Sequence, residues 1–334
     1  MKPASNLSEF YKGRRVLVTG GAGFIGSHLV ELLVMLGAQV TVPVRKTTRL
    51  HFLRSIAGEI SLIEADLFNP EQTEAVVRGQ EVVMHLAAAK GGGIAHSMHH
   101  HGSLFRDNML SFINVLDSAR DACVARTLVV SSACVYPSDS MVPAPEEEGF
   151  RDAPEPTNAG YGWSKRMGEY MALRYAEEYA MSIRIARPFN AYGPCDDFFR
   201  QSNHVIPGLI TRLFANENPL TVWGSGRQTR SFLYATDFAR GLLITCAHDG
   251  DIGPYNLGSD EEIAIKDLAA LIIELSGLEA TMVFDISKPD GQPRRACDTR
   301  RAREQIGFEA EVPFREGLKQ TIEWYKREKE LRAA

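Results

Sequence analysis

The sequence predicts an α/β fold in which a doubly wound parallel sheet is followed by a smaller C-terminal lobe. Short β-branched and apolar runs alternate with segments of helical periodicity in the first half of the chain. A glycine-rich turn joins the first such run to the first helical segment. Beyond Pro188 the alternation ends, and proline and glycine become frequent. Because this order of elements requires crossover connections between parallel strands, we expect the first half to be Rossmann-like.

The individual elements follow one another in strand–helix order. We expect strands at residues 15–19, 38–44, 60–64, 81–86 and 126–131, and helices at residues 24–36, 71–78 and 108–120. Crossovers of this kind place helices on both faces of the sheet. Residues 143–156 contain three consecutive glutamates, at 146–148, and are expected to form a solvated surface loop, with an interaction segment as the alternative.

Composition narrows the class of protein. The 334 residues are 44% hydrophobic and 24% charged, which is enough for a large buried core. A net charge of -5 argues against a nucleic-acid partner, although a local basic pocket for a phosphate is compatible with it. The first residues lack the pattern of a secretory signal, and no apolar stretch has membrane-spanning length. We therefore expect a cytoplasmic protein without a membrane partner.

The cysteines and histidines do not predict a metal site. Five cysteines are scattered along the chain and form no CxxC pair, which indicates reduced thiols. Four histidines gather at residues 96–101, but no carboxylate or cysteine joins them at ligand spacing. We expect no metal, and we interpret the histidine cluster as a substrate-facing or solvated loop.

The glycine-rich turn spans residues 19–26 (TGGAGFIG) and has the spacing GxxGxxG. Gly20 permits a tight turn, Gly23 lets backbone amides approach a pyrophosphate, and Gly26 allows the helix to pack closely on the strand. Two later strand ends support a dinucleotide site, because Asp66 is placed to bond an adenine amino group and small residues follow the strand at 81–86. The residues assigned to the cofactor are Gly20, Gly23, Phe24, Ile25, Gly26, Asp66, Leu67, Leu86, Ala87 and Ala88.

The end of the second strand bears on the choice between NAD and NADP. A carboxylate there would bind the adenosine ribose hydroxyls of NAD, but residues 42–46 (VPVRK) contain none. Arg45, with Lys46 or Arg49, can instead pair with the 2′-phosphate of NADP. We therefore favour NADP as the cofactor, with NAD as the alternative.

A second constellation combines a serine-rich strand end with a YxxxK pair. Residues 128–136 (LVVSSACVY) end a strand at the carboxyl edge of the sheet, where ligands of such folds bind. Lys165 follows Tyr161 by four residues, so its ammonium can approach the phenol in a helix. Together with the charge of a nicotinamide, it is expected to lower the pKa of Tyr161. Such a tyrosine can move a proton to or from a sugar hydroxyl, which Ser132 would orient.

Over essentially its full length the chain resembles the extended short-chain dehydrogenase/reductases. The resemblance implies that Ser132, Tyr161 and Lys165 are the catalytic triad, with Tyr161 and Lys165 also contacting the cofactor. It also implies a homodimer and a nucleotide-diphospho-sugar substrate whose diphosphate contacts Asn190 and Arg230. Residues 1–190 with about 234–258 would form the dinucleotide-binding domain, and about 191–233 with 259–334 the nucleotide-sugar-binding lobe.

Four segments resemble a narrower group within that family. Residues 87–94 (AAAKGGGI), 131–137 (SSACVYP), 203–207 (NHVIP) and 287–294 (SKPDGQPR) are similar to the GDP-L-fucose synthases, and the first two also to the GDP-mannose 3,5-epimerases. The former resemblance implies that Cys134 and His204 are the acid–base pair that inverts C3 and C5 of a GDP-sugar. A ketone at C4 acidifies the hydrogens on both neighbouring carbons. The expected substrate contacts also include Gly92, His204, Val205, Trp223 and Arg294.

The resemblance leaves the redox outcome open. The turn at residues 19–26 is closer to that of redox-neutral epimerases than to the variant motif of the GDP-L-fucose synthases. Arg45 and His204 instead favour an epimerase that also reduces C4 with NADPH, since the GDP-mannose 3,5-epimerases use a lysine as the acid. A redox-neutral C3/C5 epimerase, or another NDP-sugar 4-epimerase or dehydratase, is the alternative. A non-catalytic dinucleotide-binding regulator is the least favoured interpretation.

Overall fold

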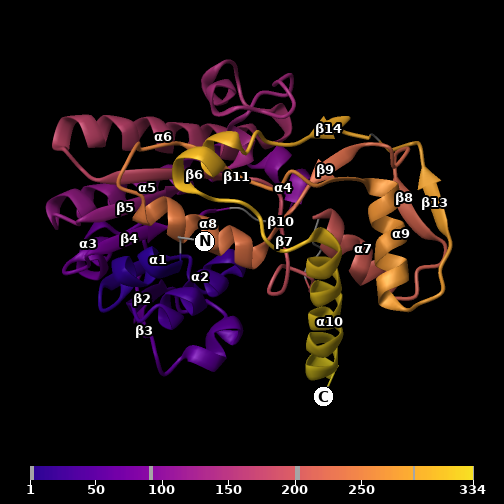
Figure 1. Ribbon diagram of the computed structural model, residues 1–334, viewed down its shortest axis with the longest axis horizontal. Coiled ribbons are helices and arrows are strands. Elements are labelled where there is room, and N and C mark those ends of the chain that lie inside the picture. Colours follow the sequence, from indigo (N-terminus) through magenta and orange to yellow (C-terminus); the bar gives the residue numbers. More distant parts are fainter. Residues whose placement is uncertain (1–3, 90–92, 200–203, 289, 334) are drawn as a thin grey trace.

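The computed structural model describes residues 4–89, 93–199, 204–288 and 290–333. Two lobes lie side by side, and the larger is built mainly from the first part of the chain (Figure 1). It contains a seven-stranded sheet in the order β11-β6-β5-β4-β1-β2-β3, whose strands all run parallel. The prediction of a doubly wound parallel sheet is confirmed.

The elements of the larger lobe agree closely with the predicted ranges, with two exceptions. The histidine cluster at residues 96–101, interpreted as a loop, lies on α4 and at the start of α5. Helix α5 begins at His101 and not at residue 108, because Gly102 and the polar residues around it hide the helical periodicity of the first turns. The strands of the sheet are β1 (Arg15–Thr19), β2 (Gln39–Val44), β3 (Ser61–Glu64), β4 (Val82–His85), β5 (Arg126–Val130), β6 (Ile183–Pro188) and β11 (Tyr255–Leu257). The helices are α1 (Ala4–Tyr11), α2 (Phe24–Met35), α3 (Pro70–Val77), α4 (Gly93–His99), α5 (His101–Asp121), α6 (Ala159–Tyr179) and α8 (Ala235–Ala247).

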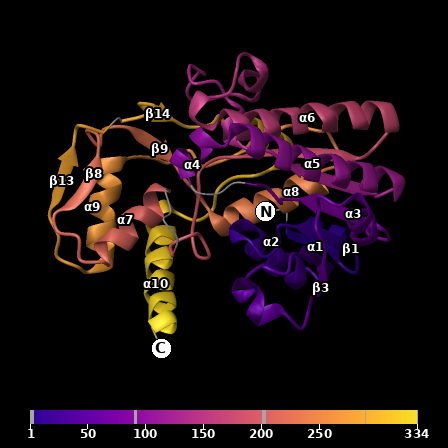
Figure 2. The ribbon, with the colours of Figure 1, turned by 180° about the vertical axis from the view of Figure 1, so that it is seen from behind.

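Burial on both faces explains why the central strands β1 and β4 are nearly continuous apolar runs. In β1, Val16 and Val18 point to the core beneath α2 and α8, while Leu17 points to the core shared with α3 and α5. Helices α5 and α6 lie side by side in both views (Figures 1 and 2). Since successive side chains of a strand alternate in direction, an apolar residue at every position requires an apolar layer on each side.

The expected solvated loop at residues 143–156 is wrong for Glu146. This side chain is buried, and its carboxylate accepts a hydrogen bond from the backbone N–H of Asn256 at 2.9 Å. Burial raises the pKa of Glu146, although the hydrogen bond opposes the shift. The local sequence could not indicate this burial, because the N–H group that the carboxylate binds lies 110 residues away.

The smaller lobe is built from short strands and α-helices around its own core. A parallel pair joins β8 and β13, and a three-stranded sheet has the order β12-β9-β14. Helix α10 stands at the side of this lobe, with the C-terminus at its end (Figure 2). The elements are α7 (Val205–Leu213), β8 (Leu220–Trp223), β9 (Thr229–Ser231), β12 (Glu262–Ala264), α9 (Ile265–Ser276), β13 (Met282–Asp285), β14 (Arg294–Arg295) and α10 (Phe314–Ala333). The two-stranded pair β7 (Ala191–Tyr192) and β10 (Leu233–Tyr234) leads from one lobe to the other.

The two lobes have separate main hydrophobic cores, and Ala302, Ile306 and Phe308 belong to the core of the larger lobe. One holds the parallel sheet with α2 and α8, and the other joins side chains of α7, α9 and α10. We propose that the domain boundaries follow these cores. Within the described ranges, none of the helices has both the length and the apolar character that a membrane crossing requires. Nor do three or more potential metal ligands gather anywhere in the part of the chain that the structure describes.

Candidate functional site

The carboxyl ends of β1 and β4 form the switch point of the sheet. The chain continues from β1 to β2 on one side and later returns to β4 on the other. The connections therefore diverge here and leave a crevice, where doubly wound folds bind their ligands. The glycine turn follows β1, and Leu86 follows β4, so the two predicted cofactor segments meet at this point.

The glycine turn has the geometry that a pyrophosphate requires. Gly20 has a φ of +72°, and a Cβ there would lie 2.9 Å from the Ala87 nitrogen. A Cβ on Gly26 would lie 2.1 Å from the Gly20 carbonyl oxygen, which no side chain permits. Helix α2 starts after Gly23 without a side-chain cap, so the amides of its first turn can accept an anion. These residues fit a nicotinamide dinucleotide.

The Thr19 hydroxyl fixes the backbone of the residues that follow β4. Its hydroxyl oxygen accepts hydrogen bonds from the backbone N–H groups of Leu86 and Ala87, both at 3.1 Å. The hydroxyl also lies 2.9 Å from Nδ1 of His85. Because its lone pairs serve the two amides, its own proton is donated to Nδ1, and the ring proton of His85 sits on Nε2. No motif in the sequence indicated His85, because its role depends on a contact with the neighbouring strand.

Protonation of His85 is expected to make the stability of the protein depend on pH. Burial, and then the charge of Lys165, lower the pKa of His85 from 6.5 to about 3. Below about pH 6.5 His85 binds a proton in the unfolded chain, whereas in the folded protein it stays neutral down to about pH 3. The stability of the folded protein therefore falls as the pH falls through this window. At about pH 5 the loss amounts to about 2 kcal/mol.

The measurement is the free energy of unfolding in urea at about pH 7.5 and about pH 5. His85→Asn keeps an acceptor for the Thr19 hydroxyl and is expected to lose about 2 kcal/mol less than the unaltered protein across this interval. The exposed His99, replaced in the same way, serves as the control and is expected to leave the difference unchanged. An equal pH dependence in His85→Asn and the unaltered protein would contradict the assignment.

The adenosine end of the crevice contains a carboxylate that the sequence analysis overlooked. We stated that no acid is available at the end of β2, but the register places Glu64 of β3 opposite Val44. Glu64 pairs with Lys46 at 3.6 Å, while the Arg45 side chain is exposed. Asp66, just beyond β3, accepts a hydrogen bond from the Phe68 amide at 3.1 Å. Arg45 therefore remains the candidate for a 2′-phosphate, and the roles of Asp66 and Leu67 remain predictions.

The structure brings Ser132, Cys134 and Tyr161 together. Tyr161 makes a side-chain hydrogen bond with Ser132, and the charge of Cys134 acts on the phenol. The Ser132 oxygen in turn accepts from the Cys134 backbone N–H at 3.2 Å. A Cβ on Gly162 would lie 2.4 Å from the Cys134 carbonyl oxygen. Gly162, which the sequence analysis missed, therefore lets α6 approach the loop that carries the serine and the thiol.

The expected lowering of the Tyr161 pKa is not found in the chain by itself. Burial raises this pKa, as does the charge of Cys134, whereas the hydrogen bond with Ser132 lowers it. The Lys165 ammonium lies 5.6 Å from the centre of the Tyr161 ring and donates to the Val130 carbonyl at 2.7 Å. It is thus held at the end of β5. A lowering of the pKa by a bound nicotinamide remains a prediction.

A buried ion pair stabilises residues 131–136, the segment that carries Ser132 and Cys134. Glu169 is 0% exposed and Arg187 is 1% exposed, and they form two parallel hydrogen bonds of 2.8 and 2.6 Å. Ser131 donates to the same carboxylate, and Arg187 also donates to the Tyr136 hydroxyl at 3.2 Å. Burial by itself lowers the pKa of Arg187, but the Glu169 carboxylate raises it well above its ordinary value. The pair fixes both ends of residues 131–136.

His204 lies on a different element from the other catalytic candidates. It directly precedes α7, and its side chain is about half exposed, with Nδ1 lying 3.6 Å from Oδ2 of Asp196. Val205 begins α7. Gly92, also predicted to contact substrate, lies outside the described residues.

The arginines of the smaller lobe include one candidate that the sequence pattern did not indicate. Arg294 is engaged by Glu262, with contacts of 2.6 to 3.1 Å, and is exposed. Arg295 instead faces Arg230, since its charge helps to lower the pKa of Arg230, after burial as the main cause. Arg295 also donates to the Ala133 carbonyl at 3.2 Å and lines a pocket beside the catalytic loop. Two adjacent guanidinium groups suit a diphosphate, so Arg295 joins Arg230 as a candidate. Arg294 lines the same pocket, and its contact with substrate remains a prediction.

Asn190 and Trp223 occupy different settings. The Asn190 amide donates to the Ser231 carbonyl at 2.9 Å and so joins the end of β6 to β9, next to Arg230. Trp223 ends β8 with an exposed ring that has the Lys288 ammonium 5.7 Å from its centre. Substrate contacts of both residues remain predictions.

Comparisons with known proteins identify the family of the chain. The model of the NAD dependent epimerase/dehydratase family matches residues 16–258. "Probable GDP-L-fucose synthase 1" from Oryza sativa subsp. japonica is 35% identical over 319 residues, which cover 94% of this chain and 92% of that protein. A "dTDP-4-dehydro-6-deoxy-D-allose reductase" from Streptomyces sp is 32% identical over 329 residues, which cover 96% of this chain and 98% of that one.

Solved structures give the same picture. An epimerase from Methanothermobacter thermautotrophicus superimposes with a TM-score of 0.89 at 29% identity and covers 99% of this chain and 98% of its own. A GDP-L-fucose synthetase from Naegleria fowleri, bound to NADP, has a TM-score of 0.79 at 26% identity and covers 96% of each chain.

Proposed function

The chain belongs to the NAD dependent epimerase/dehydratase family of nucleotide-sugar-modifying enzymes, and on this premise we propose that it inverts C3 and C5 of a 4-keto GDP-sugar and then reduces C4 with NADPH. The observation that carries the proposal is the Cys134 thiol beside the Ser132–Tyr161 hydrogen bond. A hydroxyl pair without the thiol would serve only the hydride step. The thiol adds a base next to the carbons that a C4 ketone acidifies.

In this proposal the inversion is a proton exchange across the sugar ring. The Cys134 thiolate removes the proton from a carbon beside the ketone, and the electron pair of the C–H bond moves to the C4 oxygen. The hydroxyls of Ser132 and Tyr161 stabilise the enolate by hydrogen bonds. His204 then gives a proton to the opposite face of the same carbon, and exchange with water restores the thiolate and the imidazolium.

The reduction uses the same hydroxyl pair. A bound nicotinamide supplies hydride to C4. Tyr161 gives its proton to the C4 oxygen, and Lys165, held by the Val130 carbonyl, stabilises the phenolate that remains. Support for a reductive outcome comes from the exposed Arg45 and from the relatives named GDP-L-fucose synthase and dTDP-4-dehydro-6-deoxy-D-allose reductase.

Two incubations test the proposal. With GDP-4-keto-6-deoxymannose and NADPH in deuterated water, we expect a loss of NADPH absorbance and deuterium at C3 and C5 of the product. Parallel reactions with NADH test the cofactor, for which the NADP-bound neighbour supports NADP. A redox-neutral epimerase, favoured by the spacing of Gly20, Gly23 and Gly26, would instead incorporate deuterium into GDP-mannose without net oxidation or reduction. Silence in both incubations would sink the proposal.

Replacing Cys134 by serine is expected to lower the rate of ring-proton exchange by about 100-fold or more, because a serine hydroxyl is a far weaker base than a thiolate. Binding of NADPH, measured by fluorescence titration, is expected to stay within about two-fold. Cys123→Ser, the same change at an exposed cysteine, is the control. Exchange at the unaltered rate in Cys134→Ser would remove the thiol from the mechanism.

We also propose that the enzyme is a homodimer that associates through α5 and α6. These neighbouring helices carry large exposed apolar side chains, a composition that suits an interface between two copies. The side chains are Phe105, Leu110, Ile113, Trp163 and Tyr170. Light scattering of the purified protein is expected to give twice the mass of one chain, and a monomer mass at micromolar concentration would contradict the proposal.

A further inference from the structure

Asp196 carries a buried carboxylate, and among the described residues a hydrogen bond is formed to one of its two oxygens. The residue is 4% exposed and lies in the loop that follows β7. Its Oδ1 accepts a hydrogen bond from the backbone N–H of Asp197 at 2.7 Å. Within the described ranges its Oδ2 is buried without a hydrogen-bond donor, and Nδ1 of His204 lies 3.6 Å from it. A buried carboxylate oxygen left in this state is costly, so the imidazole is its natural partner.

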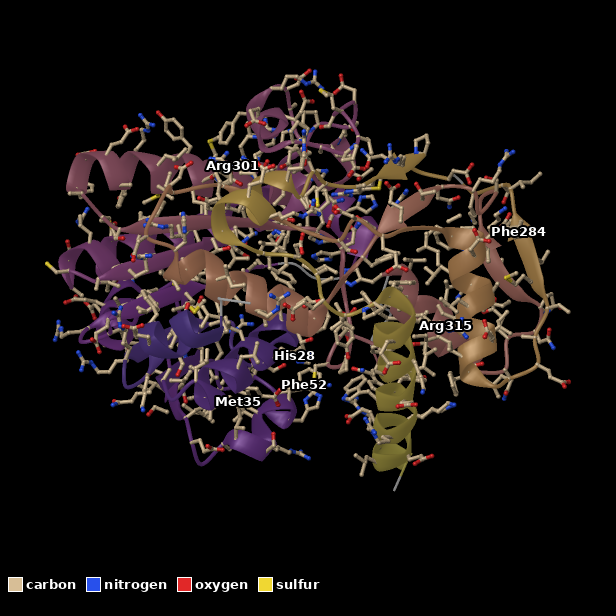
Figure 3. All side chains as sticks on the ribbon, in the orientation of Figure 1. His28, Met35, Phe52, Phe284, Arg301 and Arg315 are labelled. Atoms are coloured by element: carbon tan, nitrogen blue, oxygen red, sulfur yellow. The ribbon has the colours of Figure 1, made fainter. Side chains whose placement is uncertain are left out.

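The loop around Asp196 is fixed against the helix that begins at the cofactor turn. The Pro194 carbonyl lies 2.9 Å from Nε2 of His28, a buried residue of α2 (Figure 3). Burial raises the pKa of the Cys195 thiol to about 12, and a hydrogen bond with Ser27 opposes the shift. Cys195 has a φ of +67°, so the chain turns sharply here. Asp196 is therefore held in place by α2 independently of His204.

On the other side of Asp196, aromatic packing completes the support. The Phe198 ring is 1% exposed and lies 5.2 Å from the ring of Tyr325 and 5.5 Å from that of Trp324, both in α10. The carboxylate thus sits between a helix of the larger lobe and a helix of the smaller one. A rigidly held carboxylate can orient a neighbouring imidazole, whereas a mobile one cannot.

We propose that Asp196 is a positioning residue that fixes the tautomer and direction of His204. When Nδ1–H of His204 faces the carboxylate, Nε2 is left to meet the sugar, and the negative charge stabilises the imidazolium that gives its proton to carbon. The separation of 3.6 Å closes to a hydrogen bond as the ring becomes charged. This inference rests on the proposed function, in which His204 is the acid. It adds a residue that no motif in the sequence singles out.

The first test reads the imidazole directly and needs no substrate. In protein labelled with ¹⁵N at histidine, the His204 signal is identified by its loss in His204→Gln. We expect this signal to report a proton fixed on Nδ1 in the unaltered protein and a mixture of tautomers in Asp196→Asn. Asp197→Asn removes the same charge from the adjacent exposed residue and is expected to leave the signal unchanged.

The second test separates turnover from binding. For ring-proton exchange, we expect Asp196→Asn to lower kcat by at least about 10-fold with KM for the nucleotide sugar within about two-fold, and His204→Gln to lower kcat by about 100-fold or more. Asp196→Ser provides a second variant, with correct folding judged by NADPH binding. An unchanged His204 signal, or an unchanged kcat in both variants while His204→Gln loses activity, overturns the inference. If the unaltered protein exchanges no ring protons, the proposed function fails, and the ¹⁵N spectrum still decides the role of Asp196.

Discussion

Replacing Tyr161 by phenylalanine is expected to lower turnover of a 4-keto nucleotide sugar with NADPH by about 100- to 10,000-fold. The change removes one hydroxyl, which in the proposed mechanism protonates the C4 oxygen. The hydrogen bond to Ser132 is lost with it, so the serine can no longer share the developing charge. Affinity for NADPH is expected to stay within about three-fold, because the change leaves intact the glycine turn and the hydrogen bonds that the Thr19 hydroxyl accepts from the Leu86 and Ala87 amides.

The measurement is steady-state NADPH consumption, with cofactor affinity determined in the absence of sugar. Tyr179→Phe provides a matched control on the same helix, since Tyr179 is 42% exposed and is the last residue of α6. It is expected to be unchanged in both respects. Turnover by Tyr161→Phe within about ten-fold of the unaltered rate would assign the proton to another group and reopen the role of Ser132.

The parts of the molecule that the sequence predicted are those in which local pattern and burial agree. Strand β1 is buried on both faces, so its apolar run marks it without reference to the rest of the chain. The glycine turn could likewise be recognised from its sequence, because Gly20 and Gly26 lie where the backbone leaves no room for a side chain. Gly26 packs on Gly20, six residues earlier, and the positive φ of Gly20 is a local property of the turn.

The parts that could not be predicted depend on contacts across the sheet or between the lobes. The His85 tautomer is set by Thr19, 66 residues earlier, and Glu146 is buried by a strand 110 residues later. Arg294 and Arg295 are adjacent in sequence, and only the register of β14 beside β9 tells which of them faces Arg230. The local sequence pattern is compatible with either arrangement, so the packed structure is needed to distinguish them.

The ion pair between Glu169 and Arg187 is another contact that the local sequence could not predict. Removing one partner is expected to destabilise the protein more than any other single substitution proposed above. Glu169→Gln keeps the volume but leaves the guanidinium buried at 1% exposure without a countercharge. Breaking such a pair costs about 3 to 5 kcal/mol. The exposed Glu177, which pairs with Arg174 in the same helix, is the control, and Glu177→Gln is expected to cost less than about 1 kcal/mol.

The double variant Glu169→Leu/Arg187→Met distinguishes a missing charge partner from a disturbed fold. It removes both charges together, so its loss of stability in urea is expected to be smaller than that of Glu169→Gln alone. The Tyr136 hydroxyl and the Glu146 carbonyl also lose their donor in the double variant, and residues 131–136 are then held less firmly. Turnover should therefore fall in the double variant even where its stability recovers, because Ser132 and Cys134 lie in that segment. A double variant less stable than Glu169→Gln would instead show that the pair contributes more by its hydrogen bonds than it loses by burial of its charges.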